Sequence, residues 1–101
     1  MKRTLFWGRI RADKIEEYKE SHRQVWPELL AAYRQAGIRK ISCFLHGVDL
    51  LVYTEYDEAI YPTARKELSQ LDVCRRWDAW MREFAEPGFK AVEFEEVFRM
   101  D

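Results

Sequence analysis

The stretch IRKISCFLHGVDLLVYTEYD, residues 38–57, decides the fold of this chain. Its two halves are rich in branched and aromatic residues, and Gly47 lies between them. Such halves are typical of β-strands, and a glycine between two of them is typical of a turn. The stretch therefore predicts a β-hairpin at the centre of the chain.

Helical spacing precedes this hairpin. From Asp13 onward, side chains suited to the inner face of a helix recur at steps of three and four residues. This spacing predicts one amphipathic helix that ends at Gly37. Asp13 is expected to cap the helix, with Glu16 three residues on as in a capping box. The recurring residues are Ile15, Tyr18, His22, Val25, Trp26, Leu29 and Tyr33.

Helical spacing returns after the hairpin, and a strand is expected at each end of the chain. Residues 60–85 carry two apolar stripes, and the change of stripe near Asp72 predicts a break there. Residues 3–10 (RTLFWGRI) and 92–100 (VEFEEVFRM) have strand composition. Gly8, inside the first of these strands, indicates a bulge or a close approach of two backbones.

The predicted order is β-α-β-β-α-β, which is the ferredoxin-like arrangement of the α+β class. We expect one domain, residues 1–101, in which the helices cover one face of a four-stranded antiparallel sheet. The first strand places Leu5 and Trp7 opposite to Phe6 and Ile10, so both faces carry apolar side chains. A second protomer on the bare face would bury it, and we therefore expect a homodimer.

Composition excludes several other classes. Seventeen basic and eighteen acidic residues give a net charge of −1, so a nucleic-acid partner is not expected. The apolar runs are too short to span a membrane and no signal-peptide core follows the first residues, which favours a cytoplasmic location. Cys43 and Cys74 form no CxxC motif, so we expect two reduced packing residues, without a disulfide or a metal site.

His22 is the first candidate for chemistry. At helical spacing Tyr18, His22 and Trp26 would form a ladder that faces the sheet. One interpretation is a core histidine whose ring nitrogens are satisfied by backbone or water. The other starts from Pro27, which interrupts a helix and implies either a re-aimed second half that begins at Pro27 or a cavity beside the break. A histidine next to a cavity suits proton transfer near neutral pH.

Four segments together resemble the L-rhamnose mutarotase family, and the resemblance covers nearly the whole chain. The resemblance implies a dimeric α+β barrel that interconverts the α and β anomers of a 6-deoxyhexose pyranose, without metal or cofactor. It also implies that His22 donates a proton and that Tyr18 and Trp77 contact the sugar. The segments are EEYKESHRQVWPEL (16–29), LLVYTE (50–55), DVCRRW (72–77) and EEVF (95–98).

The chain departs from the family pattern at two positions. Many members carry a second tryptophan where this chain has Asp78, and a tyrosine where it has Ile41. Both changes alter the hydrogen bonds offered to sugar hydroxyls, which makes L-fucose or L-galactose an alternative to L-rhamnose. We therefore expect Asp78 to be among the substrate-binding residues.

Mutarotation needs a proton on the ring oxygen and the removal of the anomeric hydroxyl proton. His22 is the expected general acid, and Tyr18 is expected to bind the sugar or to orient the imidazole. Glu96 is the candidate for the second proton-transfer group, because a regular strand over 92–100 would place it among apolar side chains. The alternative is that a strand irregularity leaves Glu96 solvated, and Asp78 is the other carboxylate candidate.

The sequence is also compatible with two other classes of function. A haem- or small-ligand-binding protein of the same fold would use His22 and the tryptophans to line a cavity, although only the fold supports this alternative. A non-catalytic dimerisation module would need only the apolar bare face of the sheet. That second alternative leaves Tyr18 and His22 unexplained.

Overall fold

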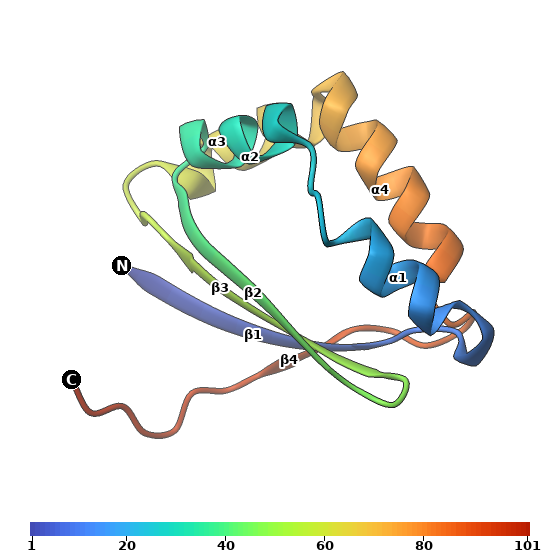
Figure 1. The fold of residues 1–101 in the computed structure, drawn as a ribbon. Helices are drawn as coiled ribbons and strands as arrows, with labels where there is room; N and C mark the ends of the chain where they lie inside the picture. The colour runs from blue at the N-terminus through green and yellow to red at the C-terminus, as the bar shows by residue number, and fades with distance from the viewer.

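A computed structural model describes residues 1–101 and shows one four-stranded antiparallel sheet with all helices on one side of it (Figure 1). The strand order is β2-β3-β1-β4. The predicted ferredoxin-like α+β fold is confirmed. The elements are β1 (Lys2–Arg9), the 3-10 turn η1 (Ala12–Lys14), α1 (Ile15–Ser21), α2 (Pro27–Gln35), β2 (Ile38–His46), β3 (Asp49–Tyr56), α3 (Tyr61–Gln70), α4 (Asp72–Phe84) and β4 (Val92–Phe94).

The single helix predicted upstream of the hairpin is wrong, because the structure has two. Helix α1 ends at Ser21, and α2 begins at Pro27. Proline has no backbone N–H to donate and its φ is preset, so it fits the first turn of a new helix better than the middle of a long one. Gly37 ends α2 with a φ of 96°, as predicted.

The expected cap at the start of this region is also wrong. Asp13 lies within η1, and its carboxylate accepts a hydrogen bond from Arg11 at 3.3 Å. No side chain caps α1, whose first residue follows Lys14. Because η1 already holds this segment in a helical turn, the capping position moves past Asp13.

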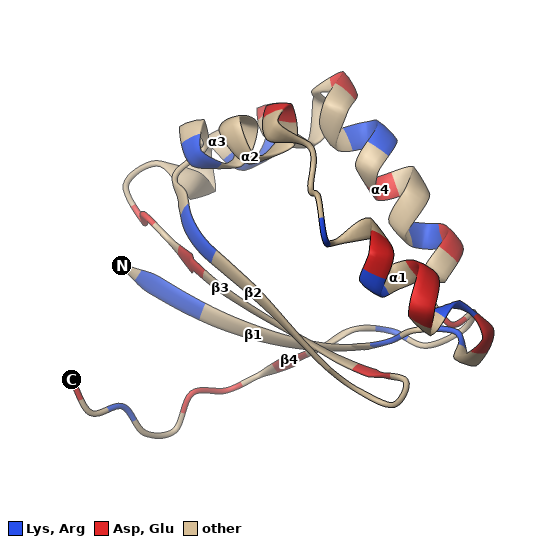
Figure 2. Ribbon diagram, in the orientation of Figure 1, with Lys and Arg blue, Asp and Glu red and all other residues tan.

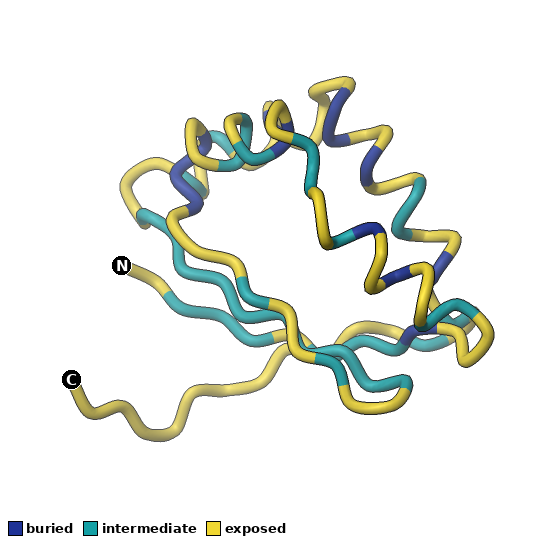
Figure 3. The backbone as a smooth tube through the Cα atoms, viewed as in Figure 1, coloured by how far each residue is buried: buried dark blue, intermediate teal, exposed yellow.

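The second helical region breaks as the sequence predicts, since α3 ends at Gln70 and α4 begins at Asp72. The buried apolar side chains form two clusters, and the partly buried Trp80 and Met81 pack against both (Figure 3). The larger lies where α2, α3 and α4 meet and includes the fully buried Leu29. The smaller consists of Ile10, Tyr18 and Phe84. Only 12 of 101 residues are buried, so the core is small for a chain of this length.

The fourth strand is shorter than predicted. Its ladder with β1 covers only Val92–Phe94, and residues 95–101 form no regular structure. Phe94 pairs with Leu5, and the three residues of β1 beyond that point, Lys2 to Thr4, pair only with β3. Three apolar side chains of this tail are exposed: Val97 (87%), Phe98 (79%) and Met100 (83%).

Gly8 forms no bulge. It lies in a regular ladder opposite Leu50, and a methyl group added to it would meet no atom within 4 Å. The register shift of the sheet lies instead at the start of β2, between Ile38 and Lys40. The predicted bulge is wrong, and the glycine leaves open space above β1.

The sheet is apolar on both faces, as predicted. Trp7, Leu51 and Phe44 lie side by side on three neighbouring strands and share the face that the helices leave bare. Phe94 of β4 adds to this row, with its ring centroid 6.2 Å from that of Trp7. Phe44 lies on the edge strand β2 and is 61% exposed.

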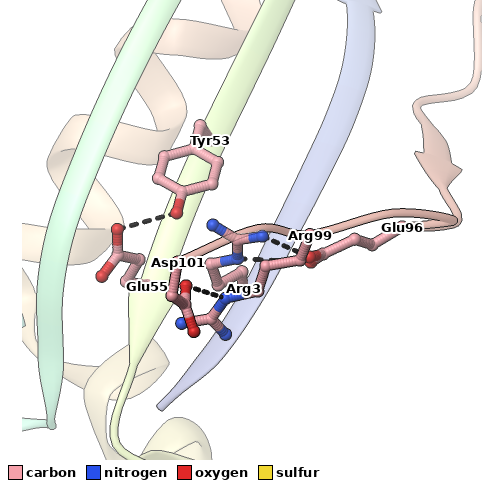
Figure 4. A network of polar contacts seen from close by, with 6 residues as sticks. All are labelled: Arg3, Tyr53, Glu55, Glu96, Arg99 and Asp101. Atoms are coloured by element: carbon pink, nitrogen blue, oxygen red, sulfur yellow. Dashed lines mark hydrogen bonds and ion pairs between the residues drawn. The ribbon is translucent and has the colours of Figure 1, made fainter.

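The other end of the bare face is polar (Figure 4). The guanidinium of Arg3 pairs with Glu96 of the tail, and the hydroxyl of Tyr53 donates to Glu55 at 2.7 Å. Acidic and basic residues are interspersed along the helices and toward the strand ends (Figure 2). No helix combines the length and hydropathy needed to cross a bilayer.

Candidate active site

A cavity of about 630 Å³ lies between the helical layer and the sheet. Its volume falls within the range of small-molecule sites, roughly 300 to 1,000 Å³. The walls are mostly apolar, and their polar side chains come from the sheet as well as from α1, the segment after it and α2. The lining includes Gly8, Tyr18, His22, Tyr33, Ile41, Cys43 and Trp77.

The break after α1 places His22 in this cavity. His22 follows the last residue of α1 and is half-buried, so its ring reaches the cavity without being enclosed by packing. Its ring centroid lies 4.3 Å from that of Tyr18 and 5.3 Å from that of Trp77. Pro27 was expected to imply either a second helix that begins at the proline or a cavity beside the break. The structure has both, since α2 starts at Pro27 and the cavity lies beside the break.

Tyr18 is buried in the last turns of α1, and its hydroxyl lies beside the thiol of Cys43 on β2. Burial is the main cause that raises the pKa of Tyr18 well above its ordinary value, and the neighbouring thiol adds to this. Burial also raises the pKa of Cys43. Both groups therefore stay protonated near neutral pH, and Tyr18 is available as a neutral hydrogen-bond donor.

The two cysteines differ in their surroundings. Both are free, and Cys74 is buried in the larger core cluster, as expected for a packing residue. Cys43 is exposed to the cavity, so its interpretation as a packing residue is wrong. Alternation along β2 turns Cys43 toward the helices and the neighbouring Phe44 toward the bare face.

Trp77 lines the cavity but is buried in a group of tryptophans on α4 and at the start of α2. Its ring centroid lies 5.1 Å from that of Trp26 and 5.6 Å from that of Trp80, both edge-on. Trp26 stacks on Trp80 and does not line the cavity. The predicted ladder therefore ends at His22, because the helix stops before the four-residue step to Trp26 is complete.

The structure does not bring the two carboxylate candidates into the cavity. Asp78 is exposed on α4, where partial burial raises its pKa, and its charge helps raise the pKa of Tyr33. Glu96 lies in the irregular tail, and its hydrogen bond with Arg3 lowers its pKa (Figure 4). The strand position predicted for Glu96 is wrong, since β4 ends two residues earlier.

Besides Arg9, one polar residue of the cavity, Tyr33, was assigned no role from the sequence. It lies in α2 one turn after Leu29, and burial raises the pKa of its phenol, so it stays a neutral donor. Ile41 lines the cavity nearby, at the position where many family members carry a tyrosine. Tyr33 belongs to the helical stripe seen in the sequence. Spacing alone, however, does not distinguish a residue that lines a cavity from one that packs in a core.

Gly8 gives a direct test of the cavity. We expect Gly8→Leu to fold with nearly unchanged thermal stability, because a Cβ at this position meets no atom within 4 Å and Gly8 lines the cavity, which has room for the rest of the side chain. The leucine side chain would occupy part of the space that a bound sugar needs. We therefore expect kcat/KM to fall at least about 10-fold. Thermal unfolding and anomer-exchange rates measure the two effects. Gly8→Ala is the control, and full activity of the leucine variant would contradict the assignment.

The fold and the cavity define a ferredoxin-like protein with a small-molecule site, and comparison with known proteins defines the family. The sequence model of the L-rhamnose mutarotase family matches residues 3–100. The chain therefore belongs to the L-rhamnose mutarotase family, which confirms the resemblance and the expectation of an isomerase-type enzyme.

Individual relatives agree with this assignment. The L-rhamnose mutarotase of Bacillus subtilis is 29% identical over 109 residues, covering 100% of both chains. The crystal structure of an L-rhamnose mutarotase from Formosa agariphila superposes with a TM-score of 0.81 at 22% identity, covering 100% of both chains. A dimeric ferredoxin-like protein from an uncultured marine organism has a TM-score of 0.66 at 18% identity, covering 98% of this chain and 96% of that one.

Proposed function

We propose that this protein is an aldose mutarotase that interconverts the α and β anomers of L-rhamnose, with His22 as the proton-transfer group. The observation that supports it most is that His22, Tyr18 and Trp77 meet in one cavity of about 630 Å³. Family membership supplies the reaction class, since relatives such as the Bacillus subtilis protein carry the name L-rhamnose mutarotase.

In the proposed reaction the ring oxygen of the sugar gains a proton and the anomeric hydroxyl loses one. His22 as imidazolium gives a proton to the ring oxygen, while the anomeric hydroxyl loses its proton and the bond between C1 and the ring oxygen breaks. The open-chain aldehyde rotates about the bond from C1 to C2, and the steps then run in reverse on the other face. Because neither Asp78 nor Glu96 lines the cavity, we assign the anomeric proton to a water molecule at its open side.

Apolar and polar walls of the cavity would contact different parts of the sugar. The edge of Trp77 and the aliphatic side chains can pack against the C–H groups of a 6-deoxyhexose. The neutral hydroxyls of Tyr18 and Tyr33 can donate hydrogen bonds to sugar oxygens. Since Ile41 removes a hydroxyl from the wall, L-fucose or L-galactose is the second candidate substrate.

Saturation-difference NMR on the anomeric protons tests the proposal. We expect the protein to accelerate exchange between the anomers of L-rhamnose and to leave at least one of L-fucose and L-galactose at the uncatalysed rate. If only L-fucose or L-galactose is accelerated, the proposed reaction stands and that sugar replaces L-rhamnose as the substrate. If no sugar is accelerated and added haem gives a saturable absorption band that His22 variants lose, the haem-binding alternative replaces the mutarotase.

We further propose that the protein acts as a homodimer joined through the bare face of the sheet. This face carries the half-buried Trp7 and Leu51 beside the exposed Phe44 and Phe94, and an apolar face of this kind is typical of an interface. The tail also leaves the body on this side (Figure 1). A cytoplasmic location stays a prediction from the sequence.

A further inference from the structure

Ser21, the last residue of α1, makes a hydrogen-bond arrangement with His22 that the proposed reaction does not yet use. Ser21 is only 6% exposed, and its hydroxyl donates to the carbonyl oxygen of Tyr18 at 2.6 Å. The Nδ1 atom of His22 lies 2.9 Å from the same hydroxyl oxygen and 3.1 Å from the same carbonyl oxygen. Three groups therefore share one small polar site at the end of the helix.

The end of the helix explains why the carbonyl is available. In a continuing helix the carbonyl of Tyr18 would accept the backbone N–H of His22. Here that N–H donates to the carbonyl of Lys19 at 3.2 Å, because the last turn tightens before the chain leaves the helix. The carbonyl of Tyr18 is left for the side chains of Ser21 and His22.

The donors and acceptors at this site determine where the imidazole proton lies. A carbonyl oxygen only accepts, and Ser21 has a single hydroxyl hydrogen, which goes to that carbonyl. The serine oxygen then presents a lone pair to His22. Both neighbours of Nδ1 are thus acceptors, so Nδ1 carries a hydrogen, and a neutral ring has its lone pair on Nε2.

We propose that Ser21 is a positioning residue, which together with the Tyr18 carbonyl holds His22 in the Nδ1–H form and leaves Nε2 as the atom that exchanges protons with the sugar. Nδ1 is turned toward the helix end, so Nε2 is the nitrogen available to a ligand in the cavity. The ring takes up and gives back its proton at Nε2 without rotating. The role in catalysis rests on the proposed function, whereas the protonated nitrogen is a property of the protein alone.

Two measurements test the proposal. Long-range 15N–1H NMR of the His22 ring in the wild-type protein should show the Nδ1–H form when the ring is neutral. Ser21→Ala removes one acceptor from Nδ1, and we expect kcat to fall about 3- to 10-fold with KM nearly unchanged, as for the loss of one hydrogen bond. The NMR pattern of that variant should show added Nε2–H form. Ser21→Thr keeps the hydroxyl and should restore both readouts.

The chain offers a matched control. Ser69 in α3 makes the same type of bond, from its hydroxyl to the carbonyl of Lys66 at 2.7 Å, but no histidine lies next to it. Ser69→Ala should change neither kcat nor the His22 spectrum. A wild-type spectrum of the Nε2–H form would overturn the proposal, as would a Ser21→Ala variant with wild-type rate and spectrum. If no sugar is accelerated but the wild type shows the Nδ1–H form, the proposed function fails and the positioning by Ser21 stands.

Discussion

Anomer exchange by His22→Asn is expected to be about 10²- to 10⁴-fold slower than by the wild type, which is the usual contribution of a positioned acid or base. Asparagine places an amide N–H near the position of Nδ1, so the hydrogen bond to the Tyr18 carbonyl can be kept. It has no group at the position of Nε2. The substitution therefore removes proton transfer while changing the end of α1 little, and saturation-difference NMR measures the rate.

The second histidine of the chain provides the control for this experiment. His46 is exposed at the end of β2 and does not line the cavity, so His46→Asn should exchange anomers at the wild-type rate. Thermal unfolding of both variants checks that they are folded. A His22→Asn variant that exchanges as fast as the wild type would remove His22 from the mechanism and leave the reaction to other groups of the cavity.

Phe44→Glu is expected to convert the proposed homodimer into a monomer. Phe44 is already exposed in the single protomer, so the change should alter the stability of the isolated fold little. In a symmetric dimer each copy brings one unpaired carboxylate into the apolar row around Trp7 and Leu51. Burial of an unpaired charge costs several kcal/mol, so we expect the dissociation constant to rise at least about 10³-fold.

Sedimentation or light scattering at several concentrations measures this effect. Leu71→Glu is the control, because Leu71 is also exposed (42%) but lies between α3 and α4, away from the bare face. It should remain a dimer. A Phe44→Glu protein that stays dimeric would show that the protomers join elsewhere, and a monomeric wild type would contradict the dimer itself.

The order of strands and helices could be predicted because each depends on local pattern. The hairpin at 38–57 and the break before Asp72 needed only composition and period. The extent of an element depends on its partners, which one sequence does not show. The last strand stops at Phe94 although β1 still has three residues beyond Leu5, and this early end leaves Glu96 outside the sheet.

The site was predicted in part for a similar reason. The residues matched to the family, Tyr18, His22 and Trp77, line one cavity, and their roles stay predictions. Trp26 was placed wrongly because helical spacing was carried across the break before Pro27. Tyr33 had a place in the helical stripe, but its hydroxyl could be assigned to the cavity only once the distance between the helices and the sheet was known.

The two buried clusters have a consequence for rigidity. Leu29 anchors one cluster, Ile10 and Phe84 anchor the other, and the cavity adjoins both. Without a ligand, the partly buried Trp80 and Met81 of α4 are the side chains that pack against both clusters. A sugar bound in the cavity would touch both clusters as well and would add a second connection between them, so binding should stiffen the fold.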